Sequence, residues 1–211
     1  SQSKPYLICL VFYPFSFLNF LACRVGFTYG LDLGCSGFEK SISFANTQIY
    51  AKSIHDENLR GMGTTCTVLL NKGDSIHIAH VGDSRIYMIS NKKLYQLTKD
   101  HSFVQSLVDA GQLHPSKMES HPKKNELTRA LGINPEVEVD VSELPILAKK
   151  GDKFFMCSDG LSGLVNDATI ENAINKGNDQ NTVLNLIEMA ENAHKNEEGI
   201  VGVPTGLRDL D

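Results

Sequence analysis

Short alternating runs of apolar and polar residues dominate the middle of the chain. The runs at residues 65–70, 76–80 and 86–89 are rich in β-branched and aliphatic residues, and polar turns containing Gly, Asn and Asp separate them. This pattern is typical of β-strands joined by tight turns, and it predicts an antiparallel meander. Two later runs, at residues 137–141 and 153–157, predict further strands.

Helical spacing of apolar residues marks four other segments. Ser102 is a plausible N-cap for one of them and Gly111 its stop signal. The polar, proline-containing segment 112–124 is expected on the surface. Because the last two predicted helices follow the strands, we predict an α+β fold with helices packed on sheet faces. The predicted helices cover residues 44–54, 103–110, 167–175 and 182–193.

The first 38 residues have a different character, with Lys4, Arg24 and Asp32 as their charged side chains. Residues 6–23 form an uncharged stretch of 18 residues, just long enough to cross a bilayer, but they are rich in aromatics and interrupted by Pro14. Three interpretations stay open. The segment is a membrane or export sequence, a region of buried strands, or a start that is not native to the following domain.

Composition narrows the class of protein. The 211 residues, 41% of them hydrophobic, favour one globular domain, with two small ones as the alternative. A net charge of −5 argues against a nucleic-acid binder, which needs clustered positive charge. Five cysteines without a C-x-x-C pair suggest neither a disulfide framework nor a zinc ribbon, so we expect a reducing, cytoplasmic compartment.

Three turns carry candidate chemistry. Asp83 follows Gly82 at the end of a strand, where it could point into a cleft or simply form a hairpin turn. Asp159 ends an apolar strand and could bind a divalent cation or cap a helical turn. His101 lies in the third turn, where a solvated or hydrogen-bonded turn histidine is the commoner role and a catalytic histidine the rarer one.

The order of these turns resembles a known family. Five motifs follow one another in the same order as in the metal-dependent (PPM, type 2C) protein serine/threonine phosphatases. They are Gly61-Met-Gly-Thr-Thr, His80-Val-Gly-Asp-Ser-Arg, Leu97-Thr-Lys-Asp-His-Ser, residues 121–132 and Gly151-Asp-Lys-Phe-Phe-Met-Cys-Ser-Asp-Gly-Leu. The match is to the bacterial branch and covers residues 44–193. The resemblance implies a β-sandwich of two antiparallel sheets flanked by helices, here incomplete.

The resemblance also implies roles for particular residues. Asp159 matches an aspartate that binds a metal of the dinuclear Mn²⁺ or Mg²⁺ centre, and Asp83 matches one associated with a weaker third metal. Residues 102–125 match a flap beside the active site. The implied reaction is hydrolysis of phosphoserine and phosphothreonine by a metal-activated water, so no protein nucleophile is expected. Implied partners are phosphorylated proteins and a cognate serine/threonine kinase, and we expect a monomer.

The ends of the sequence depart from the family pattern. The Asp-Gly metal motif expected before Phe44 is absent, as is a Gly-Gly-x-Asp-Asn-x-Thr motif after Ala193. We therefore divide the chain into an atypical hydrophobic segment (1–40), a phosphatase-type domain (41–194) and an atypical tail (195–211). The alternatives to an active phosphatase are a catalytically inactive phosphatase-like binding module and a truncated fragment.

Overall fold

The structure is a computed structural model that describes residues 7–11, 35–177 and 179–197. The chain divides into two units, residues 1–158 and residues 159–211, and each is described by itself. The first unit holds the sheets, and the second holds helices that follow the last strand.

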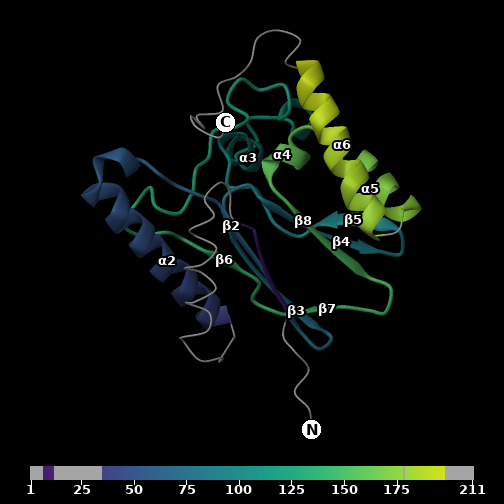
Figure 1. The fold of residues 1–211 in the computed structure, drawn as a ribbon, viewed down its shortest axis with the longest axis horizontal. Helices are drawn as coiled ribbons and strands as arrows, with labels where there is room; N and C mark the ends of the chain where they lie inside the picture. Colours follow the sequence, from purple (N-terminus) through teal and green to yellow (C-terminus); the bar gives the residue numbers. More distant parts are fainter. Residues whose placement is uncertain (1–6, 12–34, 178, 198–211) are drawn as a thin grey trace. The chain divides into compact units, whose positions relative to one another are not determined.

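The first sheet is built around two long strands, β2 (Cys66–Lys72) and β3 (Ser75–Val81), which pair from Lys72 opposite Ser75 to Cys66 opposite Val81. Every pairing in this sheet is antiparallel. Its order is β1-β2-β3-β6, and β7 also pairs with β3 (Figure 1). The shorter members are β1 (Leu7–Val11), β6 (Asp140–Val141) and β7 (Ile146–Leu147).

The second sheet has the order β5-β4-β8 and is also antiparallel. It consists of β4 (Arg85–Ser90), β5 (Lys93–Gln96) and β8 (Lys153–Cys157). The predicted strand at 153–157 is confirmed in full. Two antiparallel sheets accompanied by helices confirm the α+β class predicted from the sequence.

The meander prediction is wrong at one turn. Residues 82–84 join β3 to β4, but these strands belong to different sheets and do not pair. The turn is therefore a crossing between sheets rather than a hairpin. Gly, Asp and Ser suit both kinds of turn, so local composition could not distinguish them.

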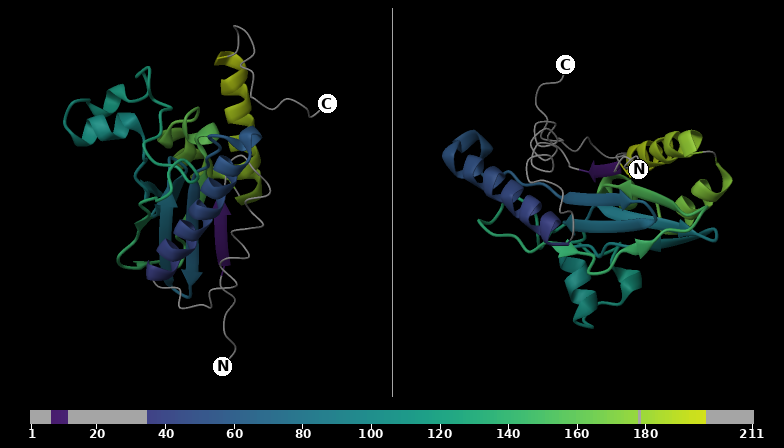
Figure 2. Two further views of the ribbon diagram at one scale, coloured as in Figure 1. Left: turned by 90° about the vertical axis from the view of Figure 1, so that its left-hand side faces the viewer. Right: turned by 90° about the horizontal axis from the view of Figure 1, so that it is seen from below.

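A helix covers one face of the first sheet. Helix α2 (Cys35–His55) buries Phe38, Ile42 and Ile49 against the alternate positions of β2 and β3 that face it. Figure 2 shows the helix lying along these strands. The buried strand positions on this face are Cys66, Val68, Leu70, Ala79 and Val81.

The opposite face of β2 and β3 packs against the second sheet. Leu69, Ile76 and Ile78 form a buried cluster with Ile86 of β4, and Phe154 and Met156 of β8 pack against it. Because side chains alternate along a strand, β2 and β3 are buried on both faces. The two sheets thus form a sandwich with α2 on its outside.

Helix α2 corrects the prediction for residues 44–54. It begins nine residues earlier, and its buried stripe is Phe38, Ile42, Ala45 and Ile49 at i, i+4, i+7 and i+11. Phe44 and Ile54, assigned to the apolar face from the sequence, are 37% and 60% exposed. Serines and a glycine among residues 36–43 hid the start of the stripe.

The segment between the sheets' strands behaves largely as predicted. Helix α3 (Phe103–Asp109) begins after Ser102, whose side chain accepts a hydrogen bond from the Gln105 amide at 3.2 Å. Gly111 ends it with a φ of 69°. A 3₁₀ turn (Pro115–Lys117) follows within the exposed segment 112–124, and another (Glu57–Leu59) lies after α2. The region around α3 projects from the sheets (Figure 2).

Residues 137–141 form less strand than the alternation predicts. Pairing is confined to β6, at 140–141. Val137 and Val139 are partly buried against the α2 core without a strand partner. The alternation therefore reflects packing on the core rather than a full strand.

The second unit consists of α4 (Asp159–Ser162), α5 (Asp167–Lys176) and α6 (Asp179–Glu197). Helix α5 is capped by Asn166, whose Oδ1 accepts from the Thr169 amide at 2.9 Å. Ile170, Ile174 and Leu186 are buried, whereas Leu184 and Ile187 of α6, expected on its apolar face, are 64% and 50% exposed.

Within the described residues, no helix combines the length and apolar character that a membrane crossing needs. Of the uncharged stretch 6–23, residues 7–11 form β1, and the rest lies outside the described residues. The same holds for most of the tail 195–211, so the proposals made for these segments stay predictions.

Candidate metal centre

The turn that carries Asp83 is tightly enclosed. Gly82 has a φ of 108°, and a Cβ atom built on it would lie 2.4 Å from Cγ2 and 2.7 Å from Cβ of Thr65. Ser84, on the other side of Asp83, shares a 2.8 Å hydrogen bond with the Thr65 hydroxyl, and its carbonyl accepts from Thr67 at 3.2 Å. Packing and hydrogen bonds thus fix the backbone on both sides of this half-buried aspartate.

His101 holds the same turn from another direction. Its backbone amide donates to the Gly82 carbonyl at 2.9 Å, and the Gly82 amide donates to His101 Nδ1 at 3.0 Å. The ring stacks on His80 with centroids 4.5 Å apart and an interplanar angle of 22°. His101 is thus a buried, hydrogen-bonded turn histidine, one of the roles that the sequence left open.

Hydrogen bonding fixes the protonation of both rings. Nδ1 of His101 accepts a backbone N–H, so in the neutral ring the proton lies on Nε2. Nε2 of His80 lies 2.8 Å from the Lys99 carbonyl, which can only accept, so this nitrogen carries the proton of His80. Burial lowers the pKa of both histidines, which favours the neutral rings.

Asp140 faces His101 at the edge of the first sheet. Its Oδ2 lies 3.1 Å from His101 Nε2, but the geometry is not that of a hydrogen bond, so the contact is electrostatic. Its Oδ1 accepts from Arg129 at 2.7 Å. Partial burial opposes ionisation of Asp140, but His101 and Arg129 outweigh it and lower the pKa.

Among the described residues, His80, His101 and Asp140 bring candidate ligand atoms within 4.8 Å of one another. Their chemistry does not fit a metal. Nε2 of His101 carries a proton as long as Nδ1 accepts from Gly82, and a nitrogen with a proton has no lone pair to give. Mn²⁺ and Mg²⁺ also prefer oxygen ligands. This cluster therefore supports the turn rather than an ion.

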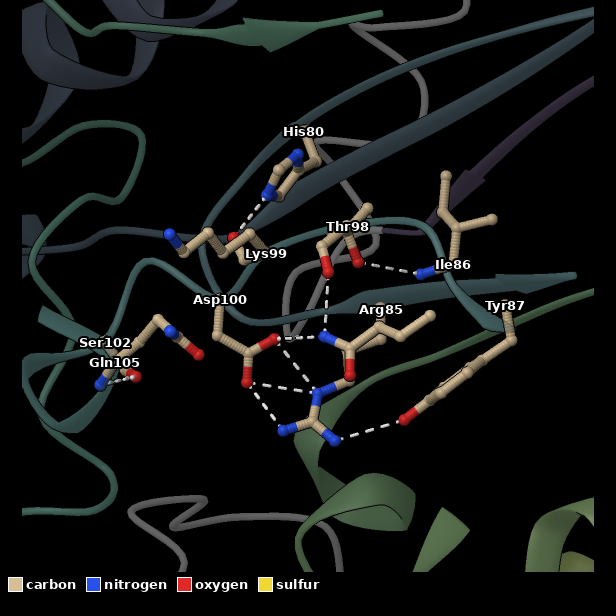
Figure 3. A network of polar contacts seen from close by, with 10 residues as sticks. His80, Arg85, Ile86, Tyr87, Thr98, Lys99, Asp100, Ser102 and Gln105 are labelled. Atoms are coloured by element: carbon tan, nitrogen blue, oxygen red, sulfur yellow. Dashed lines mark hydrogen bonds and ion pairs between the residues drawn. The ribbon is translucent and has the colours of Figure 1, made fainter. Parts of the chain in front are cut away.

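An ion pair anchors the strand that follows Asp83. Arg85 is the first residue of β4, and its Nε and Nη2 atoms donate three hydrogen bonds of 2.6–3.1 Å to the Asp100 carboxylate (Figure 3). Its Nη1 atom donates to the Tyr87 hydroxyl at 3.1 Å. Burial opposes the charge of Arg85, but Asp100 outweighs it and raises its pKa. The Asp-His-Ser turn is thereby tied to the Gly-Asp-Ser-Arg turn through side chains as well as backbone.

Asp159 is the first residue of α4, exposed, and follows β8 by two positions. In the second sheet, Cys157 of β8 pairs with Arg85 of β4. Asp83 precedes this pair by two residues and Asp159 follows it by two. The two aspartates belong to different units, so whether their carboxylates share an ion stays a prediction. Both supply the oxygen donors that Mn²⁺ and Mg²⁺ require.

The predicted flap is closed at its base by backbone hydrogen bonds. Phe103 donates to the Glu126 carbonyl at 2.8 Å, and Thr128 donates to the His101 carbonyl at 2.9 Å. Between these ends, Lys123 lies 4.8 Å above the Phe103 ring. The ends of the segment 102–125 are thus fixed beside the Asp83 turn.

Sequence reasoning did not single out Asp140 or Arg129. They lie 39 and 28 positions from His101 along the chain; Arg129 falls within the 121–132 motif, but nothing local links either residue to His101. The alternation that ends at Val141 was the available signal, since it places Asp140 on the opposite face from the core valines.

Comparison with known proteins adds independent information. The sequence model of a family described as Protein phosphatase 2C matches residues 38–195. The serine/threonine protein phosphatase PstP of Mycobacterium tuberculosis is 38% identical over 158 residues, which cover 74% of this chain and 28% of the relative. The serine/threonine phosphatase stp of Listeria monocytogenes is 39% identical over 133 residues, covering 63% and 52%. The chain thus spans between a quarter and about half of these relatives.

Solved structures agree. The M. tuberculosis PstP crystal structure matches with a TM-score of 0.74 and 32% identity, covering 89% of this chain and 82% of that one. The structure of Stp1 from Staphylococcus aureus matches with a TM-score of 0.76 and 26% identity, covering 90% of this chain and 78% of that one. The catalytic domain of PstP in complex with two manganese ions gives 0.70 at 29% identity, covering 89% and 81%.

Proposed function

The chain belongs to the protein phosphatase 2C family, and from that premise we propose that it is a metal-dependent protein serine/threonine phosphatase. The observation that carries the proposal is the family match over residues 38–195, which includes the turns of Asp83 and Asp159. Relatives named as serine/threonine phosphatases, and the confirmed two-sheet fold, support it.

Asp83 and Asp159 are the proposed metal ligands, for Mn²⁺ or Mg²⁺. When bound, such ions lower the pKa of a coordinated water and neutralise phosphoryl oxygens. The chain's own contribution is to hold the carboxylates. Thr65, Ser84 and His101 fix the backbone around Asp83, and Asp159 begins α4 two positions after the end of β8. A neighbour's two manganese ions support this choice of metal.

Partners follow from the same proposal. The proposed substrates are phosphorylated proteins, which the relatives' names as serine/threonine phosphatases support. A cognate serine/threonine kinase is a further proposed partner. We propose a cytoplasmic monomer whose phosphatase-type domain covers residues 41–194, with no nucleic-acid partner.

A catalytically inactive binding module is a second candidate. The observation that favours it is the lack, in the 211 residues, of an Asp-Gly motif before Phe44 and of a Gly-Gly-x-Asp-Asn motif after Ala193. A binding module predicts that phosphopeptide is retained in EDTA without turnover.

The test is hydrolysis of a phosphothreonine peptide and of para-nitrophenyl phosphate with millimolar Mn²⁺, Mg²⁺ or EDTA. We expect turnover with either ion and none in EDTA. We expect Asp159→Asn to lower the hydrolysis rate by more than about 100-fold. Mutating a residue that only hydrogen-bonds to a metal ligand already costs about 10–100-fold in metal affinity or activity, and loss of a ligand costs more. Asp74→Asn is the matched control, because Asp74 is an exposed turn aspartate at the other end of β3 from Asp83. No turnover with any ion contradicts the proposal.

A further inference from the structure

Both peptide planes that flank Gly82 are bonded to a single residue. The Gly82 amide donates to Nδ1 of His101 at 3.0 Å, and the Gly82 carbonyl accepts from the His101 amide at 2.9 Å. These two bonds fix the rotations on either side of the Gly82 Cα atom. The second of the two peptide planes leads directly into Asp83.

Gly82 is the residue whose freedom would otherwise let this turn move. Its φ of 108° lies in a region that glycine enters easily and other residues rarely do. Thr65 packs against the Cα atom and leaves no space on that side. Contact with Thr65 limits the turn from one side, and His101 supplies the directional bonds from the other.

The ring of His101 is itself held in place. It stacks on His80, and Asp140 lies 3.1 Å from Nε2, on the side away from Gly82. Arg129 bonds to the other oxygen of Asp140 at 2.7 Å. A carboxylate facing Nε2 favours the proton on that nitrogen, which leaves Nδ1 as the acceptor that the Gly82 amide needs.

We propose that His101 is a positioning residue for Asp83: by accepting the Gly82 amide at Nδ1 and bonding the Gly82 carbonyl, it aims the Asp83 carboxylate and so sets the affinity of the divalent ion held there. The inference rests on the proposed function of Asp83 as a metal ligand. His101 has no proposed contact with ion or substrate. It acts through the backbone of the turn.

Two substitutions separate this function from simple packing. His101→Asn places a carbonyl oxygen near the position of Nδ1, so it can still accept the Gly82 amide, although it loses the ring. His101→Gln places its polar atoms near the position of Nε2 and leaves the Gly82 amide without an acceptor. Both remove the stacking on His80, so a difference between them reports on the hydrogen bond.

The measurements are Mn²⁺ binding, followed by the electron paramagnetic resonance signal of free Mn²⁺, and hydrogen exchange of the Gly82 amide by NMR in metal-free protein. The Mn²⁺ dependence of phosphopeptide hydrolysis is a third readout. Asp83→Asn identifies which Mn²⁺ binding depends on Asp83. We expect His101→Gln to weaken that binding about tenfold, the factor that corresponds to about 1.4 kcal/mol and to one buried hydrogen bond. Gly82 exchange accelerates by at least the same factor, and His101→Asn stays within about threefold of wild type.

Asp140→Asn provides a milder test, because its side chain is 42% exposed and the bond of His101 to Gly82 is left in place. It weakens Asp83-dependent Mn²⁺ binding about two- to fivefold, the range for a partly exposed charged contact.

The outcomes are distinguishable. Folded His101→Gln protein with wild-type Mn²⁺ affinity and wild-type Gly82 exchange overturns the inference alone. So does equal impairment of the Asn and Gln variants, which would indicate a packing role. If His101→Gln does not fold, wild-type affinity in Asp140→Asn overturns it. A wild-type protein without Asp83-dependent Mn²⁺ binding overturns the proposed function, and this inference with it.

Discussion

Replacing Gly82 with alanine tests how tightly the Asp83 turn is enclosed. The new Cβ atom would meet Thr65 at 2.4 Å (Cγ2), 2.7 Å (Cβ) and 3.2 Å (Cα). Thr65 cannot easily move aside, because its hydroxyl bonds to Ser84 at 2.8 Å. The substitution therefore combines a backbone conformation that alanine disfavours with a steric clash against Thr65, the buried residue just before β2.

The two contributions can be estimated separately. A positive φ costs a non-glycine residue about 1–2 kcal/mol. Forcing an extra carbon into a packed site costs about 1–3 kcal/mol more. We therefore expect Gly82→Ala to lower the free energy of unfolding by about 2–5 kcal/mol.

Gly151 supplies the matched control. Its φ is 100°, close to the 108° of Gly82, but nothing lies within 4 Å of a Cβ atom there. Gly151→Ala thus pays for the backbone conformation alone, about 1–2 kcal/mol. Urea unfolding of the three proteins, with m-values compared, measures both losses. Equal losses in the two variants would refute the enclosure of Gly82 by Thr65.

Three further predictions concern other parts of the first unit. Asn46 is buried, and its side chain makes three hydrogen bonds with the loop 132–135. We expect Asn46→Ala to lower the free energy of unfolding by about 2–4 kcal/mol in the urea assay. Thr47→Ala, at the exposed neighbouring position, is the control and changes this free energy by less than about 0.5 kcal/mol. Burial raises the pKa of the Cys66 thiol to about 12, so we expect iodoacetamide at pH 8 to modify this thiol in denaturant but not in the native protein. Peptide mass mapping measures the modification, and a modified Cys66 in native protein would be evidence against its burial. Burial lowers the pKa of His80, so the stability that the neutral ring contributes is complete above pH 6.5, where the unfolded histidine is also neutral, and declines as the pH falls toward the lower folded pKa. We therefore expect the free energy of unfolding to fall more between pH 7.5 and 5.5 in wild type than in His80→Gln. Parallel pH curves for the two proteins would contradict this.

The parts of the fold that depend on local chemistry could be predicted from the sequence. The run of apolar residues ending at Cys157 forms β8 as expected, and Ser102 and Gly111 bound α3 as expected. In each case the signal lies within a few residues of the structure it specifies. N-caps, glycine stops and short apolar strands are of this kind.

What could not be predicted depends on contacts between distant residues. The turn at 82–84 has hairpin chemistry, and its crossing between sheets follows from pairing of β4 with β8, 64 or more positions away. The stripe of α2 is defined by what lies beneath it, which moved Phe44 and Ile54 off the buried face. Local pattern fixes the element but not its partner.

The candidate site shows the same division. Asp83 could be singled out from its turn, but the support of that turn by His101 could not, because a turn histidine looks the same whether it is solvated or buried. The contact of His101 with Asp140 joins residues 39 positions apart. The family resemblance predicts that the Asp83 turn carries a metal ligand, and the structure shows how the backbone of this turn is held.

Manganese anomalous scattering can locate the ions that we propose for Asp83 and Asp159. Crystals grown with MnCl₂ are measured at the manganese absorption edge. We expect anomalous peaks within coordination distance of a carboxylate oxygen of each aspartate. Fully occupied Mn²⁺ elsewhere in the molecule, with none at either carboxylate, would show that these aspartates are not metal ligands.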